Sequence, residues 1–90
     1  MKRNPEFLLR EVAGSLVAVP VGAATAAFPG MITLNGTGAY LWELLETEQT
    51  MNSLVEAMLQ RYEVTEQLAR NDIEAFLKRL RIAGALLEND

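Results

Sequence analysis

The first third of the chain alternates short runs of branched apolar residues with residues that favour turns. Phe7–Val12 and residues 16–19 are two such runs, which we interpret as strands. Gly14-Ser15 lies between them and suits a two-residue hairpin loop with glycine in its first central position. Pro20 has no N–H to donate to a neighbouring strand, so we expect regular pairing to weaken there.

A third strand is predicted before the helical part of the chain. Residues 23–28 have mostly small side chains and are interpreted as an extended segment, and Pro29-Gly30 offers a type II turn after them. The apolar residues 31–34 follow this turn. We interpret them as the last strand of a small antiparallel sheet.

After Leu34 the apolar spacing changes to the period of an α-helix and predicts three helices. Asn35 or Thr37 caps the first helix, which we expect to end near Thr47. Thr50 caps the second. Thr65 caps the third and longest, which ends at Ala83-Gly84 through a left-handed residue. The predicted fold class is α+β, an N-terminal three-stranded antiparallel sheet followed by three helices that cover one of its faces.

Length and composition limit the chemistry that the chain can perform. Ninety residues provide one hydrophobic core, so we expect residues 1–90 to form a single domain. The sequence has no cysteine and no histidine, which excludes disulfides, thiolate zinc sites and imidazole catalysis. Pairs of nearby carboxylates, such as Asp72 with Glu74, lie in polar surroundings typical of solvated surface charge. We therefore expect no catalytic residue, metal or cofactor.

The charge balance disfavours nucleic acid as a partner. The net charge is −4, whereas binding to nucleic acid depends largely on phosphate neutralisation by basic residues. A DNA-binding winged-helix regulator nevertheless stays open as an alternative, because Lys78, Arg79 and Arg81 lie on the third helix. They lie near its C-terminal end, while helix-turn-helix proteins contact bases with the N-terminal part of the recognition helix.

One apolar region imitates a targeting segment. Residues 12–42 carry no charge, and Lys2 and Arg3 precede them as in a secretory signal. Glu6 and Glu11 are misplaced for such a signal, and Pro20 interrupts the apolar run needed for a membrane span. We expect a cytoplasmic protein without a membrane segment.

Several short motifs follow one another in a specific order along nearly the whole chain. The most specific part is Leu34-Asn35 followed by Leu41-Trp42, because a strand must end, cap a helix and bury an aromatic ring within a few residues. The complete set is Phe7-Leu8-Leu9-Arg10-Glu11-Val12-Ala13-Gly14, Val19-Pro20-Val21-Gly22, Gly30-Met31-Ile32-Thr33-Leu34-Asn35, Gly38, Leu41-Trp42, Asp72, Phe76, Leu80 and Gly84. In this order they resemble the PqqD family, named for pyrroloquinoline quinone biosynthesis protein D.

The resemblance implies both a fold and a function. The fold is the winged-helix-like RiPP recognition element, found with enzymes that modify ribosomally made peptides. In that family the leader of a precursor peptide pairs as an extra strand with the third strand and packs against the third helix. The peptide is then delivered to a modifying enzyme, commonly a radical S-adenosylmethionine enzyme. The module itself performs no chemistry and holds no cofactor.

The residues themselves agree with a peptide site between the third strand and the third helix. Residues 31–34 contain neither Lys nor Pro to block the strand edge, which invites strand addition. Short side chains on one flank of the helix leave room for a peptide, and Phe76 is expected mainly in the core beneath it. The candidate peptide-binding residues are Met31, Ile32, Thr33, Leu34, Asp72, Ala75, Phe76, Arg79 and Ala83.

Two alternatives to an open peptide site remain at this stage. Another segment of the chain covers the strand edge, or two copies pair through it as a structural homodimer. Trp42 is expected in the core rather than in the site. The sequence does not specify the precursor peptide, its modifying enzyme, the final product or the oligomeric state.

Overall fold

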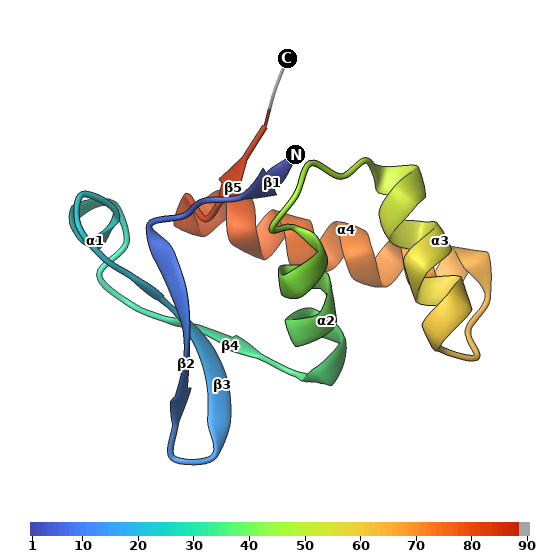
Figure 1. The fold of residues 1–90 in the computed structure, drawn as a ribbon, viewed down its shortest axis with the longest axis horizontal. Coiled ribbons are helices and arrows are strands. Elements are labelled where there is room, and N and C mark those ends of the chain that lie inside the picture. Colours follow the sequence, from blue (N-terminus) through green and yellow to red (C-terminus); the bar gives the residue numbers. More distant parts are fainter. Residues whose placement is uncertain (89–90) are drawn as a thin grey trace.

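The computed structural model describes residues 1–88, which form a small sheet at one end of a helical layer (Figure 1). In Figure 1 the longest helix, α4, crosses the molecule behind α2, and α3 lies at its other end. The strands are β1 (Lys2–Arg3), β2 (Phe7–Val12), β3 (Ser15–Pro20), β4 (Ile32–Leu34) and β5 (Leu86–Leu87), and the helices are α1 (Ala24–Ala27), α2 (Gly36–Leu44), α3 (Met51–Arg61) and α4 (Glu66–Ala83).

The β2–β3 hairpin projects from the body of the molecule as a wing (Figure 1). Its loop is Ala13-Gly14, because Val12 pairs with Ser15, so the predicted Gly14-Ser15 loop was wrong by one residue. Both loop residues have positive φ, 51° at Ala13 and 83° at Gly14. Two successive positive φ angles are the pattern of a type I′ turn, whose twist matches that of the strands.

The three main strands lie in the order β2-β3-β4 and pair antiparallel, as predicted. Pairing continues to Pro20, opposite Phe7, further than expected. Pro20 is tolerated because it lies beyond Ala18, the last residue of β3 that pairs with β4. The segment expected to be extended before the third strand instead contains the single helical turn α1, and the strand itself begins at Ile32.

The helix boundaries follow from capping side chains. Asn35, not Thr37, caps α2: its side chain accepts a hydrogen bond from the Gly38 N–H at 2.7 Å. Thr50 and Thr65 cap α3 and α4 as predicted, and Gly84 ends α4 with φ of 76°. The α2 helix ends at Leu44, three residues before the expected Thr47, and its carbonyls then accept shorter-range bonds from the following turn.

The core lies between the sheet and the helices and contains Trp42, which is 2% exposed, as expected. Other fully buried side chains come from α2 with its C-cap residue Leu45, from α3 and from α4, namely Leu41, Leu45, Leu54, Met58, Ile73, Leu77 and Leu80. After α4 the chain returns as β5, which pairs with β1 at the N-terminus. The β1 strand was not predicted, because two residues carry no periodic pattern.

One ion pair links α4 to the residue after β5. Arg81 donates a hydrogen bond to Glu88 at 2.5 Å and lowers the pKa of that carboxyl below its ordinary value. Within residues 1–88, no helix is both long and apolar enough to cross a membrane.

Candidate functional site

The open edge of β4 faces helix α4. β4 is the last strand in the sheet order and pairs with β3 on one side only. Across the other side, the Arg79 guanidinium on α4 donates a hydrogen bond of 2.7 Å to the carbonyl of Thr33. We call the space between these two elements the β4–α4 groove.

The direction of the Thr33 carbonyl determines which groups the edge offers. Residues of an antiparallel strand alternate between those that exchange hydrogen bonds with one neighbour and those whose N–H and C=O point away from it. Because the Thr33 carbonyl accepts a hydrogen bond from Arg79 on α4, the N–H and C=O of Thr33 point away from β3. The side chains of Ile32 and Leu34 are 4% and 5% exposed and pack into the core, while Thr33 is exposed. The edge of β4 therefore presents the main chain of Thr33 to the groove.

The groove consists of two hollows separated by Arg79, which lines both. The first, of about 250 Å³, lies against the N-terminus of α2 and is the more polar; it is lined by Asn35, Thr37, Gly38, Leu41, Asp72, Ala75, Phe76 and Arg79. The second, of about 220 Å³, is mainly apolar and is lined by Phe28, Met31, Ile32, Arg79, Ile82 and Ala83. A bound chain along β4 would thus meet a polar hollow and an apolar one.

Most of the predicted site residues lie together in this groove. Asp72, Ala75 and Phe76 line the polar hollow, and Met31, Ile32 and Ala83 line the apolar one. Arg79 and Thr33 meet between them. Leu34 is the exception, because it lines neither hollow and its side chain is buried in the core.

Sequence reasoning missed two residues of the apolar hollow, Ile82 and Phe28. Ile82 is 75% exposed and Phe28 partly buried, and both line the apolar hollow. Ile82 had a detectable signal, since it follows Arg79 by three positions and Ala75 by seven, which places it on the same helix flank. Phe28 had none, because only the turn after α1 brings it there.

Close packing of α2 against α4 forms the floor of the polar hollow. Gly38 is buried, and a Cβ at its position would lie 3.2 Å from the Phe76 ring and 3.1 Å from the capping oxygen of Asn35. Glycine therefore permits this approach of the two helices. The cap of α2 and the aromatic floor of the groove thus depend on one another.

The charges in the groove are few and accessible. The Asp72 side chain is exposed and makes no hydrogen bond or ion pair with another residue of the part described, residues 1–88. The same residues contain no buried polar side chain and no cluster of three His, Cys, Asp or Glu side chains arranged to hold a metal. The arrangement suits the binding of a chain molecule through main-chain groups and apolar side chains.

Comparison with known proteins agrees with this geometry. The family profile described as Coenzyme PQQ synthesis protein D (PqqD) matches residues 16–86, which include nearly all of β3, all of β4, the four helices and both sides of the groove. The chain belongs to the PqqD family. The resemblance drawn from the order of the motifs is confirmed.

A solved structure shares the fold of this PqqD family member. The structure of TbiB1 in complex with the TbiA(beta) leader peptide is similar to this chain with a TM-score of 0.77 and 20% sequence identity. The match covers 100% of this chain and 99% of TbiB1. The expected α+β, winged-helix-like fold is therefore confirmed over the full length. No curated protein matches the sequence.

Proposed function

We propose that this PqqD family member binds the leader segment of a ribosomally made precursor peptide in the β4–α4 groove and presents it to a modifying enzyme. The leader adds a strand to β4 and packs against α4. The observation that carries the proposal is the main chain of Thr33 on the edge of β4 that pairs with no strand, flanked by two hollows. The similarity to TbiB1, which was solved with a leader peptide, supports the same assignment.

Main-chain pairing supplies only part of the binding free energy. β4 has three residues, so a guest strand forms only a few hydrogen bonds with it. Each contributes about 0.5–1.5 kcal/mol, while ordering each guest residue costs about 1–2 kcal/mol. The ladder alone is therefore insufficient, and side chains of the leader must contribute the remainder.

The apolar hollow supplies that remainder. Met31 and Ile82 are 52% and 75% exposed in the free protein and would be covered by an apolar leader side chain. Full burial of one large aliphatic or aromatic side chain contributes roughly 1.5–3 kcal/mol. The preference for one leader over another is decided largely in this hollow, and the polar hollow with Asp72 favours a hydrogen-bond donor on the other side of Arg79.

The chain performs no chemistry in this proposal. It acts in the cytoplasm as a single recognition domain, residues 1–90, and holds no cofactor. The bound leader places the remainder of the precursor within reach of a peptide-modifying enzyme, of the radical S-adenosylmethionine class or another.

Substitution of Ala75 tests the proposal. Ala75 is exposed on the wall of the polar hollow, so Ala75→Glu places a charged side chain in the groove without disturbing the core. We expect the loss of measurable leader binding in titration calorimetry, while the circular dichroism spectrum and thermal unfolding stay unchanged. The peptide is the leader segment of a short precursor encoded beside the gene.

A matched control separates the groove from a general charge effect. Gln67→Glu adds the same charge to α4 at an exposed position near its N-terminus that lines neither hollow of the groove. This variant should bind the leader with unchanged affinity. A folded Ala75→Glu protein that binds as tightly as the control would refute the placement of the leader.

A homodimer that pairs through β4 is the alternative use of the same strand edge. Such a homodimer would use the main chain of Thr33 and exclude the leader. Size-exclusion chromatography with and without leader distinguishes the two, because the proposed function predicts one copy of the chain per leader.

A further inference from the structure

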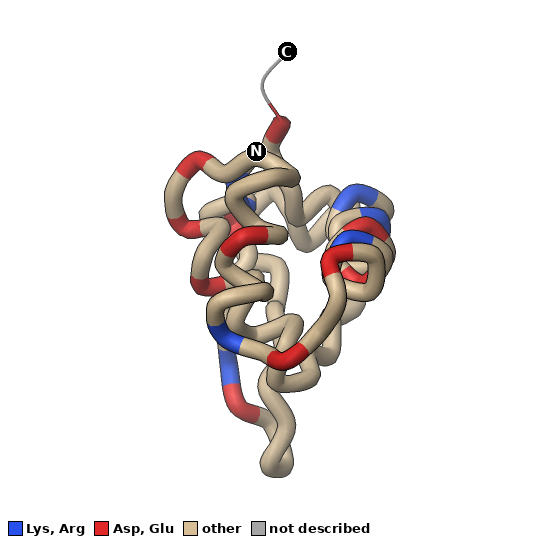
Figure 2. Tube along the Cα trace, turned by 90° about the vertical axis from the view of Figure 1, so that its right-hand side faces the viewer, with Lys and Arg blue, Asp and Glu red and all other residues tan. Residues whose placement is uncertain are grey.

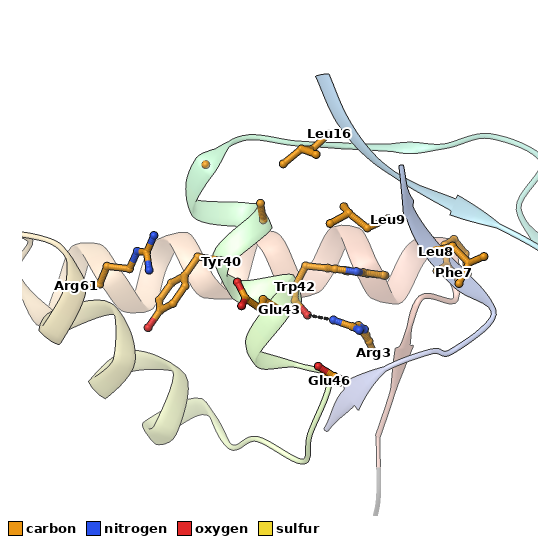
Figure 3. A pocket seen from close by; sticks show the side chains of 12 residues that line it. Arg3, Phe7, Leu8, Leu9, Leu16, Tyr40, Trp42, Glu43, Glu46 and Arg61 are labelled. Atoms are coloured by element: carbon orange, nitrogen blue, oxygen red, sulfur yellow. Dashed lines mark hydrogen bonds between the residues drawn. The ribbon is translucent and has the colours of Figure 1, made fainter. Parts of the chain in front are cut away.

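A second and larger hollow lies on the other side of α2 from the groove. Its volume is about 430 Å³, and it opens between the β2–β3 hairpin, α2 and the C-terminal end of α3 (Figure 3). This exceeds either hollow of the groove and lies within the range of about 300–1,000 Å³ typical of binding sites. Its lining residues are Arg3, Phe7, Leu8, Leu9, Leu16, Gly36, Ala39, Tyr40, Trp42, Glu43, Glu46 and Arg61. We call it the hairpin hollow.

Apolar side chains of the hairpin form one wall of the hairpin hollow. Leu9 pairs with the buried Ala18, and Leu16 pairs with the buried Leu34, so both leucines project from the face of the sheet that covers the core. They are nevertheless 40% and 37% exposed. The hairpin extends past the helices that should cover this face, and part of its core-type surface is left without a partner among residues 1–88.

The two arginines that line the hairpin hollow are already engaged. Arg3 donates a hydrogen bond of 2.8 Å to the Trp42 carbonyl, and its guanidinium lies 5.6 Å from the centre of the Trp42 ring. Arg61 lies over the Tyr40 ring at 4.4 Å. These contacts hold both cations against aromatic faces, where they form the walls of the hollow.

The two carboxylates of the hairpin hollow have no such partners. Glu43 and Glu46 are exposed, and neither side chain makes a hydrogen bond or an ion pair with the residues that the structure describes. Figure 3 shows Glu43 between Tyr40 and Trp42, with Glu46 beyond it near Arg3. The hollow therefore combines uncovered leucines with two carboxylates that form no ion pair, while its two guanidinium groups keep their charge but are held against aromatic rings. The carboxylates and leucines together suit a segment that carries both basic and aliphatic side chains.

The hairpin hollow and the groove are independent of one another. No residue lines both, and α2 separates them. Ala39 and Glu43, one helical turn apart, face the hairpin hollow, whereas Gly38 and Leu41 face the groove from the opposite side of the helix. Both sites can therefore be occupied at the same time.

We infer that the hairpin hollow is a second docking site, which takes a segment of the modifying enzyme with a lysine or arginine beside large aliphatic side chains. The basic side chain pairs with Glu43 and Glu46, and the aliphatic side chains cover Leu9 and Leu16. That the partner is the modifying enzyme rests on the proposed function. That the partner segment is basic and aliphatic rests only on the residues of the hollow. Binding on opposite sides of α2 would let the chain hold enzyme and leader together.

The test uses two synthetic peptides and the complete chain. One is a blocked pentapeptide of alternating leucine and lysine, and the other alternates leucine and glutamate. Nuclear magnetic resonance titrations follow the Trp42 indole and the methyl groups of Leu9 and Leu16. We expect saturable shifts of these signals with the basic peptide and none with the acidic one at the same concentrations.

Charge reversal provides the matched variants. Glu43→Lys with Glu46→Lys should weaken binding of the basic peptide roughly tenfold, since each exposed ion pair contributes a factor of a few. Glu43 lies in the last turn of α2, where a cation is favoured by the helix dipole, so the variant should fold normally. Glu56→Lys with Glu74→Lys makes the same change in net charge outside the hairpin hollow and should bind like the unmodified protein.

Three results would each overturn the inference. They are equal binding of both peptides, unchanged affinity in the Glu43→Lys, Glu46→Lys variant, and shifts of the same signals on concentration of the protein alone, which would assign the hollow to a second copy. Leader binding is followed separately through Ala75 and Ile82 in the groove. The proposed function and this inference can therefore fail independently.

Discussion

Arg79 occupies the position that a guest strand requires. Its guanidinium donates to the Thr33 carbonyl, the main-chain acceptor that β4 presents to the groove. In the free protein this contact satisfies the acceptor and separates the two hollows. A leader that adds a strand to β4 must supply an N–H to the same carbonyl, so Arg79 competes with the leader.

Removal of this competitor should strengthen leader binding. A hydrogen bond contributes about 0.5–1.5 kcal/mol net, so we expect Arg79→Ala to lower the dissociation constant by about two- to tenfold. Titration calorimetry measures the change. Lys78→Ala, which removes the same charge beside the groove without a bond to β4, is the control and should change the constant little. A tenfold weaker complex with Arg79→Ala would mean that Arg79 contacts the leader directly.

Ala13, in the loop of the β2–β3 hairpin, carries backbone strain. Its φ is 51°, in the left-handed region that alanine adopts at a cost and that asparagine tolerates well. Asn-Gly is the more favourable sequence for a type I′ turn than Ala13-Gly14.

We therefore expect Ala13→Asn to raise the free energy of unfolding by about 0.5–1 kcal/mol. Urea denaturation followed by the fluorescence of Trp42, the single tryptophan, measures it. Ala13→Val should shift the stability in the opposite direction, because a β-branched side chain is strained at positive φ. Equal stability of the three proteins would argue against the observed loop geometry.

At the scale of elements, α4 contributes one face to the core and another to the groove. One stripe, including Ile73, Leu77 and Leu80, is fully buried in the core. The neighbouring flank, with Ala75, Arg79 and Ile82, lines the groove. Because the core stripe fixes the rotation of the helix, the groove flank is positioned without any contact to the leader.

Ile82 tests the contribution of this flank. It is 75% exposed, so Ile82→Ser should leave the fold intact while removing apolar surface that the leader would cover. We expect leader affinity to fall about five- to thirtyfold, equivalent to about 1–2 kcal/mol. Leu68→Ser, at a 54% exposed leucine of α4 that lines neither hollow of the groove, is the control. Equal affinities of the two variants would exclude Ile82 from the binding surface.

At the scale of the whole molecule, the charge distribution separates peptide from nucleic acid as the partner. The chain has 12 acidic and 8 basic residues, and Figure 2 shows Asp and Glu positions distributed among the Lys and Arg positions. Arg79 is hydrogen-bonded to Thr33 and Arg81 to Glu88, so two of the basic residues near the end of α4 are engaged within the chain.

Salt dependence measures this distinction. A protein that contacts 6–10 phosphates loses about 10³–10⁵ in affinity between 50 and 200 mM salt, whereas apolar burial is little affected. We expect the dissociation constant of the leader complex to change by less than about threefold over that range. Duplex DNA should not shift in a gel at either salt concentration, and a salt-sensitive shift would favour the winged-helix regulator.

The location of the groove could be predicted from the sequence, but not all of its residues. That residues 31–34 would lie opposite one flank of the third helix followed from the unblocked strand edge and from helical periodicity, together with the family resemblance. The removal of Leu34 from the site did not, because alternation along a three-residue strand places it on the core side only once the register with β3 is known. Phe28 and the hairpin hollow were equally out of reach, since both depend on how the β2–β3 hairpin and α1 lie against the helices.

The sequence by itself determined the type and order of the main elements, the caps at Thr50, Thr65 and Gly84, and the buried stripe of α4, and it narrowed the cap of α2 to Asn35 or Thr37. Each of these depends on neighbours within a few positions along the chain, so local chemistry is sufficient. Only the tertiary structure decided that Arg79 holds the carbonyl of Thr33, that β1 pairs with β5, and that two leucines of the hairpin stay uncovered. These features join residues far apart in the sequence, and their geometry is fixed by the packing of whole elements rather than by any local pattern.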